Sequence, residues 1–204
     1  MRRIGILLFA CSLLAIGVGR AAAQEATPDS TTGTVACTVE PRPIDEMLGT
    51  WFSPEGTPVA TPEPEPPVTS EAELPQGDPV DPEIEDAINA TLQEIFACFD
   101  DGDYGRAFAL FTDDYLLQFG PEMGTTLEQT RDFLEASPVP VPDEQRIEIG
   151  RMRDARMLPD GRVGAILDAP GGSVFFLFEE HEGRWLLDGI IAIFAAPDIA
   201  TPTG

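Results

Sequence analysis

The chain contains no Lys, and His181 is the single His among its 204 residues. All 12 basic residues are therefore Arg, and they stand against 36 acidic residues, for a formal net charge of −24. Nucleic acids and anionic lipid surfaces repel a chain this acidic, so we expect no nucleic-acid partner and no docking on a membrane. His181 stands in a Glu/Gly turn and is expected to be solvated, with no second His beside it, so neither a zinc site nor Ser–His or Cys–His catalysis is supported. We expect no metal and no cofactor.

Long apolar runs are scarce as well. The run over residues 4–18 is shorter than the roughly 20 residues that a membrane-spanning helix needs. Two Arg precede it and three Ala, ending at Ala23, follow it, which is the order of a secretory signal peptide. We therefore expect a secreted bacterial protein that loses residues 1–23 on export. An uncleaved anchor, lipid attachment at Cys11 and twin-Arg export remain alternatives.

Residues 24–80 are predicted to form an acidic tether, since residues 53–82 alone contain nine Pro. Such a stretch buries too little apolar surface to offset the entropy lost on ordering. One short helix near residues 43–52 is expected within it, because four apolar residues share one helical face. A helix this short is marginal alone and should dock on something. The four residues are Ile44, Met47, Leu48 and Trp51.

Two Cys, Cys37 and Cys98, remain after removal of a signal peptide. Export favours their oxidation to a disulfide. The bridge would close a loop of about 60 residues, worth roughly 4 kcal/mol in the loop-entropy model, and would staple the tether to the domain. The alternative is a buried thiol at Cys98 and an unrelated Cys37.

A globular domain is predicted over residues 81–196, followed by a tail at 197–204. Asp81 caps a first helix that ends near Gly102, and Asp103 caps a second. A short strand is expected at 115–119. A third helix should start at Thr125, which has the capping-box spacing with Glu128, and stop at 137–138.

Four strands are predicted next, at residues 146–158, 162–168, 173–180 and 184–194, joined by Gly-containing turns. The order predicts an α+β fold, with a β-bulge at Gly150 where the first strand loses its alternation. The last two strands are apolar on both faces. One face should meet the helices, and the other needs a cover, either a second copy in a homodimer or the helix near 43–52.

The element order and three short phrases resemble the nuclear transport factor 2-like superfamily, particularly its SnoaL-like members. The phrases are FDDGDY at 99–104, ALFTDD at 109–114 and EGRWLLD at 182–188. The resemblance covers residues 81–196 and implies a cone, in which three N-terminal helices pack on a bent antiparallel sheet around an apolar pocket. The residues expected to line that pocket are Phe99, Tyr104, Phe108, Phe119, Phe133 and Trp185.

Members of this family include isomerases, dehydratases, polyketide cyclases and non-catalytic binding domains, so the fold alone does not decide the function. The candidates for an Asp/Tyr acid–base pair are Asp114, Tyr115 and Asp188. The hairpin that often supplies catalytic groups in the enzymes is reduced to residues 115–125, which counts against catalysis. Asp188 is predicted to be buried, and an ion pair explains a buried carboxylate as well as a catalytic role does.

Arg151, Arg153 and Arg156 are the expected partners of Asp188 and the expected contacts of any anion. The leading hypothesis is a non-catalytic domain that binds a small apolar ligand or a partner protein. One alternative is a cofactor-free isomerase, dehydratase or hydrolase. Another is an assembly module whose pocket is filled by its own side chains.

Overall fold

The computed structural model describes residues 35–120, 124–146, 149–169 and 172–194. The predicted signal peptide and the tail at 197–204 lie outside them. No helix in the described ranges is long and apolar enough to cross a membrane. The helices are α1 (Ile44–Trp51), α2 (Pro82–Asp100), α3 (Tyr104–Phe108), α4 (Asp113–Leu116) and α6 (Leu127–Glu135), with 3-10 turns at Glu71–Glu73 and Asp143–Gln145. The strands are β1 (Asp78–Pro79), β2 (Arg153–Met157), β3 (Val163–Ala169), β4 (Gly172–His181) and β5 (Arg184–Ile193).

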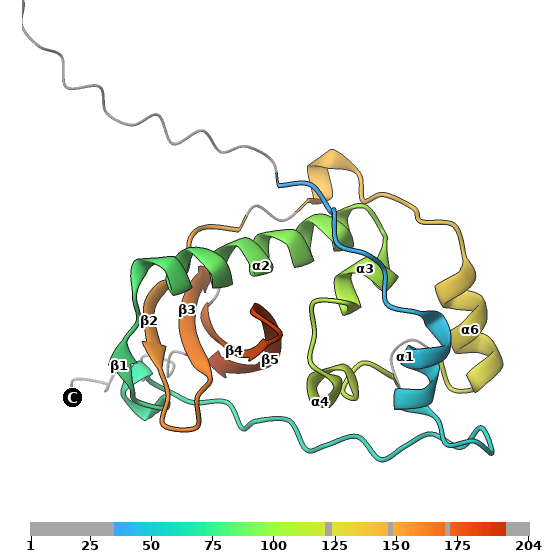
Figure 1. Ribbon diagram of the computed structural model, residues 1–204, viewed down its shortest axis with the longest axis horizontal. Helices are drawn as coiled ribbons and strands as arrows, with labels where there is room; N and C mark the ends of the chain where they lie inside the picture. Colours follow the sequence, from blue (N-terminus) through green and yellow to red (C-terminus); the bar gives the residue numbers. More distant parts are fainter. Residues whose placement is uncertain (1–34, 121–123, 147–148, 170–171, 195–204) are drawn as a thin grey trace, which may run out of the picture. The chain divides into compact units, whose positions relative to one another are not determined.

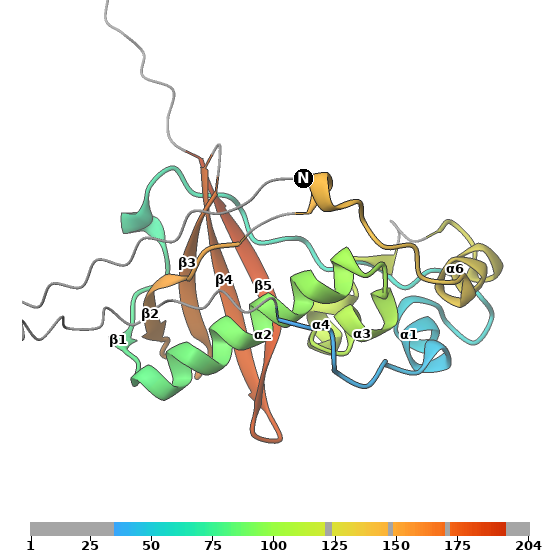
Figure 2. The same ribbon diagram turned by 90° about the horizontal axis from the view of Figure 1, so that it is seen from above.

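The fold is α+β, as predicted. Its strands form one open antiparallel sheet in the order β1-β2-β3-β4-β5, and the helix α2 crosses one face of it (Figures 1 and 2). The expected four-stranded meander is therefore confirmed. A fifth strand, β1, is added from the Pro-rich segment, where Asp78 and Pro79 pair with β2.

Three local expectations are wrong. Residues 115–119 are not a strand, because the Thr112 hydroxyl accepts from the Tyr115 amide and begins α4. The bulge lies not at Gly150 but between Arg153 and Arg156, where Asp154 has a φ of 56°. The cap of α6 is not Thr125 but Thr126, whose hydroxyl accepts from the Gln129 amide.

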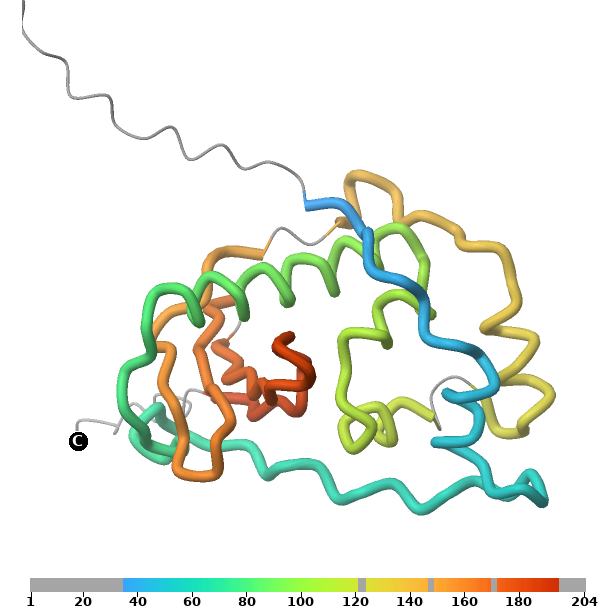
Figure 3. The backbone as a smooth tube through the Cα atoms, in the orientation of Figure 1, coloured from blue at the N-terminus to red at the C-terminus, as the bar shows by residue number. Residues whose placement is uncertain are grey.

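The sheet separates two apolar clusters. The larger cluster joins the α2 face of the sheet to α1, α3 and α4. The smaller lies on the opposite face, where Leu74 is 2% exposed and Val68 packs beside it. This face is thus covered in part by the segment 53–77 between α1 and β1, which we call the strap (Figure 3). The expectation that α1 covers it is wrong, since α1 contacts α6 and α4.

Backbone hydrogen bonds fix the strap to the edge of the sheet. The Val68 amide donates to the Ala192 carbonyl at 3.0 Å, and the Phe194 amide donates to the Val68 carbonyl at 3.0 Å. A strand edge otherwise presents unpaired donors and acceptors, so these bonds satisfy part of the β5 edge. The Pro-rich composition does not prevent this, because the anchoring residues Val68 and Leu74 are apolar.

The predicted disulfide between Cys37 and Cys98 is confirmed, with the two Cα atoms 4.7 Å apart. It joins the segment before α1 to the buried face of α2. Beside it, Glu94 accepts hydrogen bonds from the amides of Thr38 and Val39 and from the Thr38 hydroxyl, and it pairs with Arg184 at 2.7 Å between Nη2 and Oε2. Burial alone would raise the pKa of Glu94, but the Thr38 bonds, the Arg184 charge and the Val39 bond together lower it.

Replacing this carboxylate, Glu94→Gln, is expected to lower the free energy of unfolding by about 1 kcal/mol near neutral pH. Because the pKa of Glu94 is lowered in the folded state, its stabilisation is complete above the ordinary value of 4.5 and is lost as the pH falls through the folded value. Urea denaturation near neutral pH and near about pH 3 should therefore show the difference from wild type closing in acid. Glu144→Gln, at an exposed acid without an ion pair in the described residues, is the matched control. A difference that persists in acid would contradict the charge as its cause.

Candidate functional site

The region where the resemblance places a pocket is packed with aromatic rings. Phe108 is fully buried and lies edge-on to Trp51, Phe99 and Phe111 at centroid distances of 5.7, 6.1 and 5.5 Å. Tyr104 and Phe119 complete its surroundings. Five of the six residues predicted to line the pocket lie in or against this core, namely Phe99, Tyr104, Phe108, Phe119 and Trp185. The sixth, Phe133, is 38% exposed and its ring contacts Tyr104. None of the six is among the residues that line a cavity.

Asp188 is held in place by two partners. The register shift in β5 makes it the extra residue of a β-bulge, which turns its carboxylate out of the ladder. Its Oδ1 accepts from the Thr112 hydroxyl at 2.8 Å, and its Oδ2 lies 3.0 Å from Nη1 of Arg162. The side chain is 12% exposed. The buried carboxylate is thus neutralised, by Arg162 rather than by the expected Arg151, Arg153 or Arg156.

The other two acid–base candidates, Asp114 and Tyr115, are neighbours in α4, but the first is exposed and the second is buried. Asp114 is exposed in the first turn of this helix, where a carboxylate complements the helix dipole. Tyr115 is 4% exposed, and its ring packs against Phe111 and Phe119 at 5.2 Å in each case. Asp114 and Asp188 line one cavity, and Tyr115 is not among its lining residues.

Each of the three Arg expected to meet an anion contacts carboxylates of this chain. Arg151 pairs with Glu85 and Asp86 at 3.0 and 2.7 Å between Nη2 and the carboxylate oxygens. Arg153 pairs with Glu71 of the strap and with Asp168, at 2.7 and 2.8 Å. The hydrogen bond from Arg153, followed by that from Ser173, lowers the pKa of Asp168 to about 2.

The third, Arg156, is buried, pairs with Asp154 and stacks over the Phe175 ring at 5.4 Å. Through these contacts, the three Arg connect the strap, β2 and α2 to neighbouring segments of the chain. An anion would have to displace these carboxylates to bind here.

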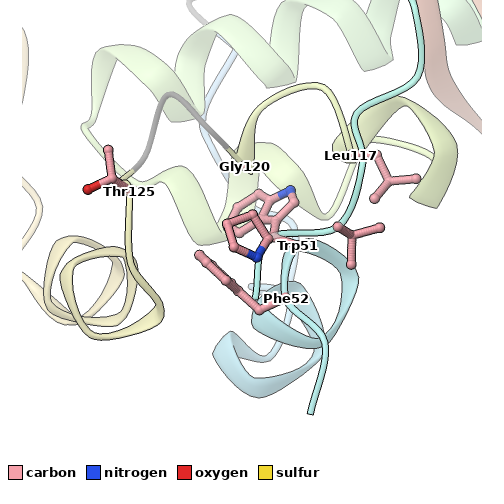
Figure 4. A pocket seen from close by; sticks show the side chains of 8 residues that line it. Trp51, Phe52, Leu117, Gly120 and Thr125 are labelled. Carbon is pink, nitrogen blue, oxygen red and sulfur yellow. The ribbon is translucent and has the colours of Figure 1, made fainter. Parts of the chain in front are cut away.

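The first cavity, of about 230 Å³, lies where α1 ends (Figure 4). Trp51 forms its wall and is fixed by a hydrogen bond of 2.7 Å from its Nε1 to the Leu116 carbonyl. The strap turns back over this wall, since the Val59 amide donates to the Trp51 carbonyl at 2.8 Å. Among the described residues, the lining is apolar except for Thr125 and comprises Trp51, Phe52, Pro58, Val59, Leu117, Gly120, Gly124 and Thr125. We call it the Trp51 cavity.

Two residues shape the rim of the Trp51 cavity, Gly120 and Val59. A Cβ at Gly120 would lie 2.6 Å from the Trp51 ring, so the chain can pass this close to the ring only with glycine. Val59, on the strap, is 41% exposed, although it is a large apolar side chain. An apolar surface therefore continues from the interior of the cavity to its mouth.

The second cavity, of about 360 Å³, lies between the strap, α4 and the edge of the sheet. Its lining is mostly polar and comprises Pro62, Glu63, Glu65, Asp114, Gln118, Arg162, Leu177, Asp188, Gly189 and Ile190. Four carboxylates thus face one guanidinium, for a formal local charge of −3. We call it the acidic cavity. No group of three or more side chains suited to a metal ion occurs in the described ranges.

Sequence reasoning missed both cavities because each joins the strap to α4 or to the segment that follows it, about 50 residues further along the chain. A signal for the first was present, since Val59 is an apolar residue amid Pro and Glu. The second had none, since charge runs in Pro-rich segments are usually solvated.

Comparisons with protein-family models, with curated proteins and with solved structures find no match to this chain.

Proposed function

We propose that the protein is an exported, non-catalytic binding module that receives an apolar group of its ligand in the Trp51 cavity. The observation that carries the proposal is a preformed apolar hollow whose main wall, Trp51, is 3% exposed and hydrogen-bonded in place. Pockets of this kind, with few polar groups, are the common form of ligand sites. Because the wall is already fixed, binding would lose little conformational entropy.

The division of apolar and acidic groups between the two cavities favours binding over catalysis. An isomerase-type site places a carboxylate base and a hydroxyl donor in one apolar pocket, which tunes their pKa values. Among the described residues, the lining of the Trp51 cavity contains no carboxylate, and the lining of the acidic cavity contains no Tyr. Asp188, the more buried of the two carboxylate candidates, already accepts from Thr112 and Arg162.

Membership in the nuclear transport factor 2-like superfamily, with its cone, is part of the proposal. The order of helices before an antiparallel meander supports it, as does the contact between two of the matching phrases. The Thr112 amide donates to the Leu187 carbonyl at 2.9 Å, and Leu187 donates in turn to Leu110 at 2.8 Å. The homodimer expected through the sheet stays a prediction, and the strap leaves less of that face for it.

Filling the cavity tests the proposed function. Leu117 is half-buried in its lining, so Leu117→Trp should occupy the space and reduce the affinity for the neutral fluorescent probe N-phenylnaphthylamine by about tenfold or more. Phe133→Trp, at a position 38% exposed and outside the lining, is the control for an added indole. If Leu117→Trp is folded by circular dichroism and binds the probe as wild type does, the proposed function is wrong.

A further inference from the structure

The Trp51 cavity and the acidic cavity are lined by residues that are neighbours in the chain. Leu117 lines the first and Gln118, the next residue, lines the second. On the opposite wall, the strap contributes Val59 to the first and Pro62 to the second. Consecutive Cα atoms are about 3.8 Å apart, so a chain with an apolar group in one cavity reaches the other within a few residues.

Three carboxylates of the acidic cavity are available to a ligand. Glu63, Glu65 and Asp114 are exposed, and none of them has an ion pair or hydrogen bond within the described residues. The fourth carboxylate and the one cation of the lining, Asp188 and Arg162, pair with each other. A hollow lined by unpaired charges of one sign attracts the opposite charge.

From this juxtaposition we infer that the ligand is a basic polypeptide segment of a partner protein, in which an apolar side chain is followed closely by Arg or Lys. The inference rests on the proposed function and narrows it to one class of partner. The apolar side chain enters the Trp51 cavity, and the cationic side chain lies among Glu63, Glu65 and Asp114.

The size of the apolar cavity suits a single apolar group, such as one side chain, better than the whole of a drug-sized molecule. At about 230 Å³ it lies below the range of roughly 300–1,000 Å³ typical of small-molecule pockets. Charge complementarity decides between a second copy of this chain and a basic segment as the ligand. A second copy of this chain, with a net charge of −24 and no Lys, would be repelled, whereas a basic segment is drawn in.

The test uses the full mature chain and a short fluorescein-labelled Gly/Ser peptide that carries one Phe followed by two Arg. Wild type should bind this peptide with an affinity that falls as salt rises. Peptides with Phe→Ser or with both Arg→Gln should each bind more weakly by about fivefold or more. Fluorescence anisotropy measures all three.

On the protein side, Glu63→Gln with Glu65→Gln should weaken the Phe–Arg peptide about fivefold and leave the neutral probe unaffected. Both residues are exposed, so the substitutions leave the core intact. Glu144→Gln with Glu180→Gln removes the same charge at exposed positions outside both cavities and should change neither affinity.

The outcomes separate the inference from the proposed function. If the double variant at Glu63 and Glu65 binds the peptide as wild type does while Leu117→Trp still abolishes probe binding, the inference is overturned and the proposed function stands. Equal loss in the control at Glu144 and Glu180 also overturns it, because the attraction would then come from the net charge. If Leu117→Trp changes neither affinity, both fall.

Discussion

Removal of the disulfide, by Cys37→Ala with Cys98→Ala, is expected to lower the free energy of unfolding by about 4 kcal/mol. The bridge joins residues 61 apart in the sequence, and in the loop-entropy model its main effect is to restrict the unfolded chain. Few single contacts in a domain of this size contribute as much, since the whole net stability is typically about 5–15 kcal/mol. Urea denaturation of the oxidised wild type and of the variant measures the difference.

Cys98→Ala alone is the matched control. It breaks the same bridge, so it should cost as much as the double replacement, and it separates the bridge from any effect of Cys37 itself. Wild type under a reducing agent should show a similar loss. A loss below about 1 kcal/mol would contradict the prediction, because it would mean that the unfolded chain gains little freedom when the bridge is absent.

Binding at the Trp51 cavity should survive this change in conditions where the variant remains folded. The helix α1 carries the wall of the cavity, and it is held by its own packing. Met47 and Leu48 are buried at 0% and 3% exposure, and Trp51 donates to Leu116 across the core. The bridge lies before α1 and acts on global stability, whereas the cavity depends on contacts that follow it.

Local patterns predicted the elements that local contacts determine. The helix α1 follows from the spacing of Ile44, Met47, Leu48 and Trp51, and α2 begins at Pro82 after Asp81, as the sequence indicates. The β3–β4 and β4–β5 hairpins follow from their turns. Residues 115–119 were ambiguous because a short apolar run fits a strand or a helical turn, and the Thr112 cap decides for the helix.

Contacts between residues far apart in the sequence cannot be predicted from local patterns. Averaged composition marks the strap as a solvated linker, yet two of its residues, Val68 and Leu74, anchor it to the sheet. The partner of Asp188 depends on a bulge that aims this carboxylate toward Arg162 rather than toward β2. The sequence shows each acidic residue of the acidic cavity, but it does not indicate that Glu63 and Asp114 line the same surface.

Removing the central aromatic ring, by Phe108→Ala, is expected to cost about 4 kcal/mol. Phe108 is fully buried and contacts five other aromatic rings, so truncation loses its transfer free energy and leaves a hollow that its rigid neighbours fill only in part. Phe133→Ala is the control, because that ring is 38% exposed and is expected to cost about 1 kcal/mol or less. Urea denaturation compares the two. A cost for Phe108→Ala below about 1.5 kcal/mol would show that the neighbouring rings close the gap.

The same substitution distinguishes a filled interior from an open pocket. If wild type lacks an internal site because Phe108 occupies it, Phe108→Ala should bind benzene, a probe of the size of the ring that is removed, within the aromatic cluster. Combining it with Leu117→Trp closes the Trp51 cavity, so any remaining binding comes from the new hollow. Probe binding by this double variant, with little by Leu117→Trp alone, is the expected result. This result would mean that Phe108 fills the interior pocket that the family resemblance implies, and that the ligand binds instead at the Trp51 cavity.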